Sequence, residues 1–94
     1  MRVSFAASVS SPTEILVSHV GDESVILNLN SECYFGLDAV GTRMWTVLTT
    51  SESIQAAYET LLREYEVDAE SLRRDLDDLI EKSVEHGILE ISSD

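Results

Sequence analysis

The residues with the clearest chemical potential are one cysteine and two histidines. Cys33 is the only cysteine, while His19 and His86 lie far apart and outside any metal-ligand spacing. The chain contains no phosphate-binding glycine loop, no dinucleotide fingerprint and no Gly-x-Ser-x-Gly elbow. We therefore expect no catalytic residue, no metal ligand and no cofactor. We also expect Cys33 to be a buried structural thiol, because free cysteine is among the most buried residue types. The alternative is a small enzyme in which Cys33 meets a histidine in space.

A second candidate is a run of acids near the C-terminal end: Asp75, Asp77, Asp78, Glu81 and Glu85. Spacings of three and seven place Asp75, Asp78 and Glu85 roughly on one face of a helix, which invites a metal-binding or catalytic interpretation. A solvated helix face, partly neutralised by Arg74 and Lys82, explains the same pattern. We favour the solvated face, because charge runs on helices usually serve solvation.

The charge balance restricts the partners. Eighteen acids and six bases give a formal net charge of −12 in 94 residues. Nucleic acid and anionic membrane are disfavoured, because each phosphate contact needs a Lys or Arg. A neutral or basic peptide, or a basic protein surface, is favoured. The chain has no apolar run of membrane-spanning length and no signal-peptide core, and a single cysteine allows no internal disulfide. These features predict a cytoplasmic protein.

The pattern of elements predicts one α+β domain. Residues 1–12 are expected to form a flexible arm, with the question open whether Val3, Phe5 and Val9 add a strand, and residues 92–94 a tail. Residues 13–37 carry three short runs typical of strands, separated by Gly21-Asp22 and by Asn30-Ser31-Glu32, which predicts an antiparallel meander.

Three amphipathic helices are expected to cover this sheet. The first begins at Ala39 with Asp38 as its cap, the second follows a cap at Ser51, and the third follows a cap at Asp68 and ends at Gly87. Gly41 inside the first helix suggests a close approach of helix to sheet. Residues 88–91 are expected to be extended.

The ordered set of these motifs resembles the PqqD-like family. The resemblance rests on the strand-turn-strand segment ending in Tyr34-Phe35-Gly36-Leu37, on Gly41 and Trp45 in the first helix, and on the third helix with its Gly-Ile-Leu ending. It covers residues 13–91. Family members are recognition elements for ribosomally made, post-translationally modified peptides, and the pattern is most similar to the stand-alone leader-binding subunit of lasso-peptide pathways. The implied fold resembles a winged helix-turn-helix, with a three-stranded meander followed by three helices.

The resemblance also implies a mechanism. The leader segment of a precursor peptide would add as an antiparallel strand to the third strand, in the groove beside the third helix. The chain would then be a non-catalytic carrier that delivers the leader to a cysteine-protease-type leader peptidase, and also to the cyclase. The implied site residues are Glu32, Cys33, Tyr34, Phe35 and Gly36 on the strand and Leu72, Asp75, Leu76 and Leu79 on the helix. The three leucines fit plain core equally well.

A winged-helix DNA-binding regulator is the alternative from another class, because its fold would be similar. Residues 52–94 hold thirteen acids and four bases, which argues against a helix that enters a DNA groove.

Overall fold

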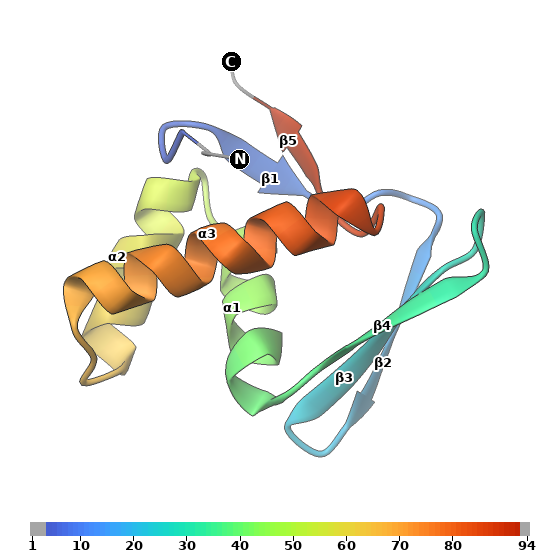
Figure 1. Ribbon diagram of the computed structural model, residues 1–94, viewed down its shortest axis with the longest axis horizontal. Coiled ribbons are helices and arrows are strands. Elements are labelled where there is room, and N and C mark those ends of the chain that lie inside the picture. Colours follow the sequence, from blue (N-terminus) through green and yellow to red (C-terminus); the bar gives the residue numbers. More distant parts are fainter. Residues whose placement is uncertain (1–3, 93–94) are drawn as a thin grey trace.

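Two antiparallel sheets and three helices make up the chain in this computed structural model, which describes residues 4–92 (Figure 1). Val3 therefore lies outside the described residues. The elements follow in the order β1 (Ser8–Ser10), β2 (Ile15–Val20), β3 (Glu23–Asn28), β4 (Cys33–Leu37), α1 (Ala39–Thr50), α2 (Ile54–Glu64), α3 (Ala69–Glu85) and β5 (Glu90–Ser92). This order confirms the expected meander followed by three helices.

Strands β2, β3 and β4 form the meander in that spatial order, so β2 and β4 are its edges. Ile26 on the central strand is fully buried and pairs with Phe35 of β4 and Val17 of β2. Successive side chains of a strand alternate between faces, so Val25 and Leu27 point away from the core. The inner face packs Ile26 and Leu37 against Ile88 and the half-buried Trp45 and Leu79.

The helix starts follow local capping chemistry. The Asp38 side chain accepts a hydrogen bond from the Gly41 N–H, and the Asp68 side chain accepts one from Ser71. These two caps are as predicted. For α2, however, the cap is Ser53, whose side chain accepts from Ala56, and the prediction of Ser51 is wrong. Ser51 instead ends α1. Ser51 and Ser53 are chemically equivalent as caps, so sequence did not separate them.

Two glycines stand where a larger residue would not fit. Gly87 ends α3 with φ of +72°, and a Cβ there would lie 2.6 Å from Asn28 Nδ2. Gly41 has an ordinary helical backbone, but the space beside it is small. A Cβ there would lie 3.2 Å from Asp38 Oδ1 and 3.2 Å from Leu37 Cδ2. The close approach expected at Gly41 is thus to the end of β4 and its cap.

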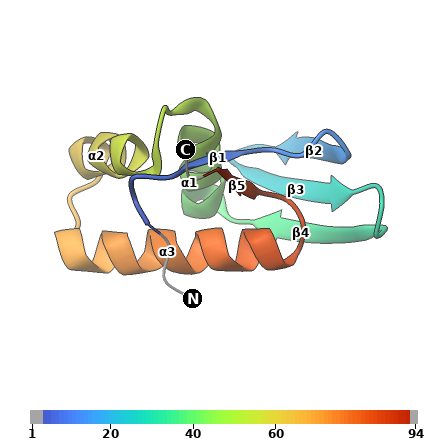
Figure 2. The same cartoon turned by 90° about the horizontal axis from the view of Figure 1, so that it is seen from above.

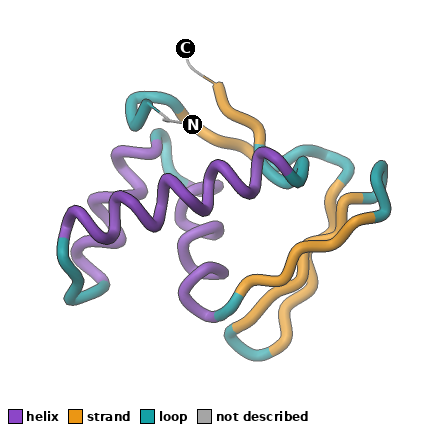
Figure 3. The backbone as a smooth tube through the Cα atoms, viewed as in Figure 1, coloured by secondary structure: helices purple, strands orange, loops and turns teal. Residues whose placement is uncertain are grey.

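The main core is built from side chains of the three helices, purple in Figure 3, and of the N-terminal segment. Its centre consists of fully buried side chains from all three helices, among them Leu48, Ile54, Leu61, Leu76 and Ile80. A buried polar pair joins this part to the sheet, because Ser24 Oγ and Thr42 Oγ1 lie 2.8 Å apart.

The N-terminal segment differs from the expected flexible arm. Strand β1 pairs with β5 at the other end of the chain, with Val9 opposite Ile91. Phe5, Ala7 and Val9 are buried in the main core. The carbonyls of Ala7 and Phe5 accept the N–H groups of Ile54 and Gln55 at 2.9 and 2.8 Å. These are the N–H groups that a helix leaves without internal partners, so residues 5–7 complete the start of α2.

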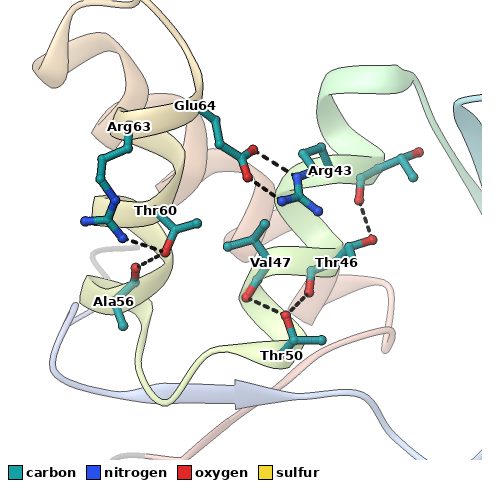
Figure 4. A network of polar contacts seen from close by, with 9 residues as sticks. Arg43, Thr46, Val47, Thr50, Ala56, Thr60, Arg63 and Glu64 are labelled. Carbon is teal, nitrogen blue, oxygen red and sulfur yellow. Dashed lines mark hydrogen bonds and ion pairs between the residues drawn. The ribbon is translucent and has the colours of Figure 1, made fainter.

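An ion pair ties α1 to α2 on the surface (Figure 4). Arg43 donates through two nitrogens to the Glu64 carboxylate, with Nε to Oε2 at 2.9 Å. The side-chain hydrogen bond from Arg43 lowers the pKa of Glu64, and the same contact raises the pKa of Arg43. Threonine hydroxyls donate hydrogen bonds to backbone carbonyls within each helix. Thr50 donates to the Thr46 carbonyl and Thr60 to the Ala56 carbonyl.

Candidate functional site

The open edge of β4 is the first part of the site. The register places Glu14 opposite Leu29, and the Leu29 N–H donates to the Glu14 carbonyl at 2.8 Å. Backbone groups alternate in direction along an antiparallel strand. The backbone groups of Leu27 and Val25 therefore hydrogen-bond to β2, whereas those of Ile26 and Ser24 hydrogen-bond to β4.

The same alternation fixes the direction of the groups on β4. Phe35 and Leu37 lie opposite Ile26 and Ser24, so their N–H and C=O groups face β3. The N–H and C=O groups of Tyr34 and Gly36 consequently point out of the sheet. A guest strand on this edge would find two donors and two acceptors within three residues.

Helix α3 runs along the open side of β4, and β2 lies at the far side of the meander (Figure 2). A depression of about 280 Å³ lies between the two elements. Its apolar floor comes from the half-buried Phe35 and Leu79 and from Leu37. Its remaining lining residues are Gly36, Asp38, Gly41, Asp75, Asp78 and Lys82.

Charge surrounds this apolar floor. Asp75, Asp78 and Lys82 follow one another at intervals of three and four on α3, so they share the face toward β4. All three are exposed, whereas Asp38 already accepts the Gly41 N–H at 2.8 Å. The rim is therefore mostly acidic with a single cation at one end.

Two contacts hold the sheet against the end of α3, one from β4 and one from β3. The Phe35 ring packs on the His86 imidazole with centroids 4.8 Å apart, and His86 Nδ1 lies 2.8 Å from the Lys82 carbonyl. Asn28 donates through Nδ2 to the carbonyls of Gly87 and His86 at 3.2 and 3.4 Å, and its Oδ1 accepts from the Asn30 N–H.

The structure places the predicted strand residues along this edge. Tyr34, Phe35 and Gly36 lie on β4 as described, and Glu32 precedes it in the turn with φ of +60°. Cys33 begins the strand and is exposed, so the expectation of a buried thiol is wrong.

The predicted helix residues divide into two groups. Asp75 and Leu79 line the depression. Leu72 and Leu76 are 3% and 0% exposed and belong to the main core, so they do not line it. The sequence placed Asp78 on one helix face with Asp75 but assigned neither Asp78 nor Lys82 to the peptide site. Sequence reasoning also missed Asn28 and His86, whose contacts bridge 58 residues and leave no local signal.

The site offers backbone pairing, an apolar floor and a charged rim, which together suit a peptide in extended conformation. Within residues 4–92, no group of three or more His, Cys, Asp or Glu side chains is arranged to hold a metal ion. In the same range, no helix has the length and apolar character required to cross a membrane.

A three-stranded meander on three helices, with one strand edge open beside a helix, is the architecture of recognition elements for ribosomally synthesised, post-translationally modified peptides. The family model described as coenzyme PQQ synthesis protein D (PqqD) matches residues 23–89. This chain belongs to the PqqD family.

Two solved structures are similar to this chain. One is TbiB1 in complex with the TbiA(beta) leader peptide, with 33% identity and a TM-score of 0.79 over 86% of this chain and 94% of that one. The other is lasso peptide synthetase B1 complexed with the leader peptide, with a TM-score of 0.78 over 88% of this chain and 98% of that one. At 24% identity, the second supports the fold alone. No protein with a curated description matches the chain.

Proposed function

We propose that this chain binds the leader segment of a ribosomally synthesised precursor peptide and delivers it to a separate enzyme of lasso-peptide biosynthesis. The leader adds to β4 as a fourth antiparallel strand. The chain itself performs no chemistry, and the receiving enzyme is a cysteine-protease-type leader peptidase, with the cyclase as a second recipient.

The observation that carries the proposal is the outward direction of the Tyr34 and Gly36 backbone groups beside the α3 depression. Backbone hydrogen bonds to these residues supply sequence-independent docking. A guest side chain that points inward meets Phe35, Leu37 and Leu79, and its burial supplies selectivity. The 33% identical TbiB1, solved with a leader peptide, supports a leader as the guest.

The charged rim favours a particular kind of leader. A basic guest residue beside Asp75 and Asp78 gains Coulomb attraction, which raises the association rate more than the affinity. An acidic guest residue is best accommodated near Lys82. Because these side chains are exposed, added salt should weaken the preference.

Proline substitutions on the two sheet edges test the docking mode. Tyr34→Pro and Gly36→Pro each remove one outward donor and leave the hydrogen bonds between β3 and β4 in place. We expect each variant to unfold cooperatively and to bind a fluorescent leader peptide at least about tenfold more weakly, a loss of about 1.4 kcal/mol.

His19→Pro is the matched control. By the same alternation, the N–H of His19 points outward from the other edge strand, β2. This variant should keep wild-type leader affinity. Loss of leader binding in His19→Pro alone would show that the leader pairs with β2 instead of β4. Full leader affinity in all three folded variants would exclude strand addition to either edge.

A further inference from the structure

The outer face of the meander is unusually apolar. Alternation from the buried Ile26 places Leu16, Val25, Leu27 and Tyr34 on this face, and the register aligns Leu16, Leu27 and Tyr34 in one row across the three strands. An antiparallel sheet with one covered face usually turns polar side chains to water on the other.

The exposed apolar surface of the molecule gathers here. Eight large apolar side chains are exposed among residues 4–92, and five of them lie on this face: Leu16, Val20, Val25, Leu29 and Tyr34. Their exposed fractions run from 40% to 75%. They add nothing to the core, which packs on the opposite face. Contiguous exposed apolar surface of this kind marks an interaction site.

The charge of this face indicates the chemistry of its partner. Glu14 and Glu23 share the outer face with Leu29 and Val20, and residues 13–37 contain no Lys or Arg. A second copy of the chain would bring two acidic rims together, at a net charge of −12 each. A protein surface with an apolar centre and a basic rim is complementary instead.

The face is continuous with the proposed leader site. Tyr34 and Gly36 turn their backbone groups to the guest and their side-chain positions to the outer face. A Cβ built on Gly36 has no neighbour within 4 Å. A strand added to β4 widens the sheet, so every second guest side chain joins the outer face beside these residues.

We propose that the outer face of β2, β3 and β4 is the docking surface for the enzyme that receives the leader, a protein with a basic-rimmed apolar patch. This proposal rests on the proposed function, because the bound leader supplies part of the surface. The receiving enzyme contacts the chain and the outward leader side chains together. Leader and enzyme therefore strengthen each other's binding by the same factor.

Leu16→Lys tests the face without touching the leader edge. Leu16 lies on β2, two strands away from the guest, and is 55% exposed. Val67→Lys is the matched control, since Val67 is 48% exposed in the segment between α2 and α3 and the charge change is identical. Val20→Lys, at a position 71% exposed, repeats the test at the end of the strand.

The measurement is the affinity of each variant for the leader peptidase, with and without saturating leader peptide. We expect leader to tighten peptidase binding to wild type at least fivefold. Leu16→Lys and Val20→Lys should weaken peptidase binding at least tenfold while leader affinity and melting temperature stay unchanged, and Val67→Lys should behave as wild type.

Other outcomes separate the two proposals. Wild-type peptidase affinity in both outer-face variants overturns the docking face, whatever the leader does. A wild-type dimer that Leu16→Lys dissociates would assign the face to a second copy and also overturn it. Absence of leader binding to wild type defeats the proposed function, and with it the coupling between leader and peptidase.

Discussion

Asn28 helps to position the site although it does not line the depression. One amide connects β3, the following turn and the end of α3, because Nδ2 donates to Gly87 and His86 while Oδ1 accepts from Asn30 and Ser31. Only a side chain with both donors and an acceptor satisfies this geometry.

Asn28→Asp should therefore destabilise the fold. The carboxylate has no donor for the Gly87 and His86 carbonyls and places negative charge against them. We expect a loss of about 1–3 kcal/mol in the free energy of unfolding, measured by urea denaturation near neutral pH. Asn30→Asp, the same change at an exposed neighbour, should have little effect, and equal stability of the two variants would contradict this role.

Cys33 is exposed at the start of β4 and is the only thiol. Cys33→Ala should leave leader affinity and thermal stability close to wild type, because the side chain is not packed. Cleavage of the leader by the partner peptidase should also continue. A folded Cys33→Ala protein that binds leader normally but stops cleavage would give the thiol a chemical role.

Among the elements, α1 and α2 are linked by a surface ion pair whose contribution depends on pH. Arg43 lowers the pKa of Glu64 in the folded chain. The pair therefore stabilises the fold above the ordinary carboxyl pKa, and this contribution is lost as the pH falls through the lowered folded pKa. The contribution is small, because both side chains are exposed.

Thermal melts of wild type and Glu64→Gln between pH 7 and pH 3 test whether the stabilisation by the ion pair is lost as the pH falls. The variant should melt below wild type at pH 7, and the difference should shrink at acid pH. Glu59→Gln is the control on the same helix, since Glu59 contacts the neutral Gln55. A difference that grows on acidification would contradict the assignment.

For the whole molecule, the charge distribution decides between peptide and nucleic acid. A helix-turn-helix arrangement alone permits both, but a net charge of −12 does not provide the cations that phosphate contacts need. We expect no gel shift of duplex DNA at micromolar protein and physiological salt. A shift at sub-micromolar protein that added salt abolishes would restore the regulator hypothesis.

The sequence predicted the parts of this fold that local chemistry determines. Alternating apolar residues and turn signals located β2, β3 and β4, and Asp38, Asp68 and Gly87 marked helix ends. The burial of Phe5 and the pairing of Val9 with Ile91 depend on contacts across most of the chain. Local pattern carries no information about such pairs.

The candidate site divides in the same way between local and long-range information. The edge residues Tyr34 and Gly36 were identifiable, but the direction of their N–H groups follows from register and one hydrogen bond at Leu29. Leu72 and Leu79 belong to one apolar stripe in the sequence, and only the packing of α3 separates core from groove.

The pairing of Ser8 with Ser92 brings the two flanks of the domain to one place. The start of β1 and the end of β5 are therefore neighbours (Figure 1). Such a domain can be spliced between two adjacent residues of a host protein's surface loop without stretching either junction. The exposed Gly21-Asp22 turn offers a place at which a permuted chain could be opened.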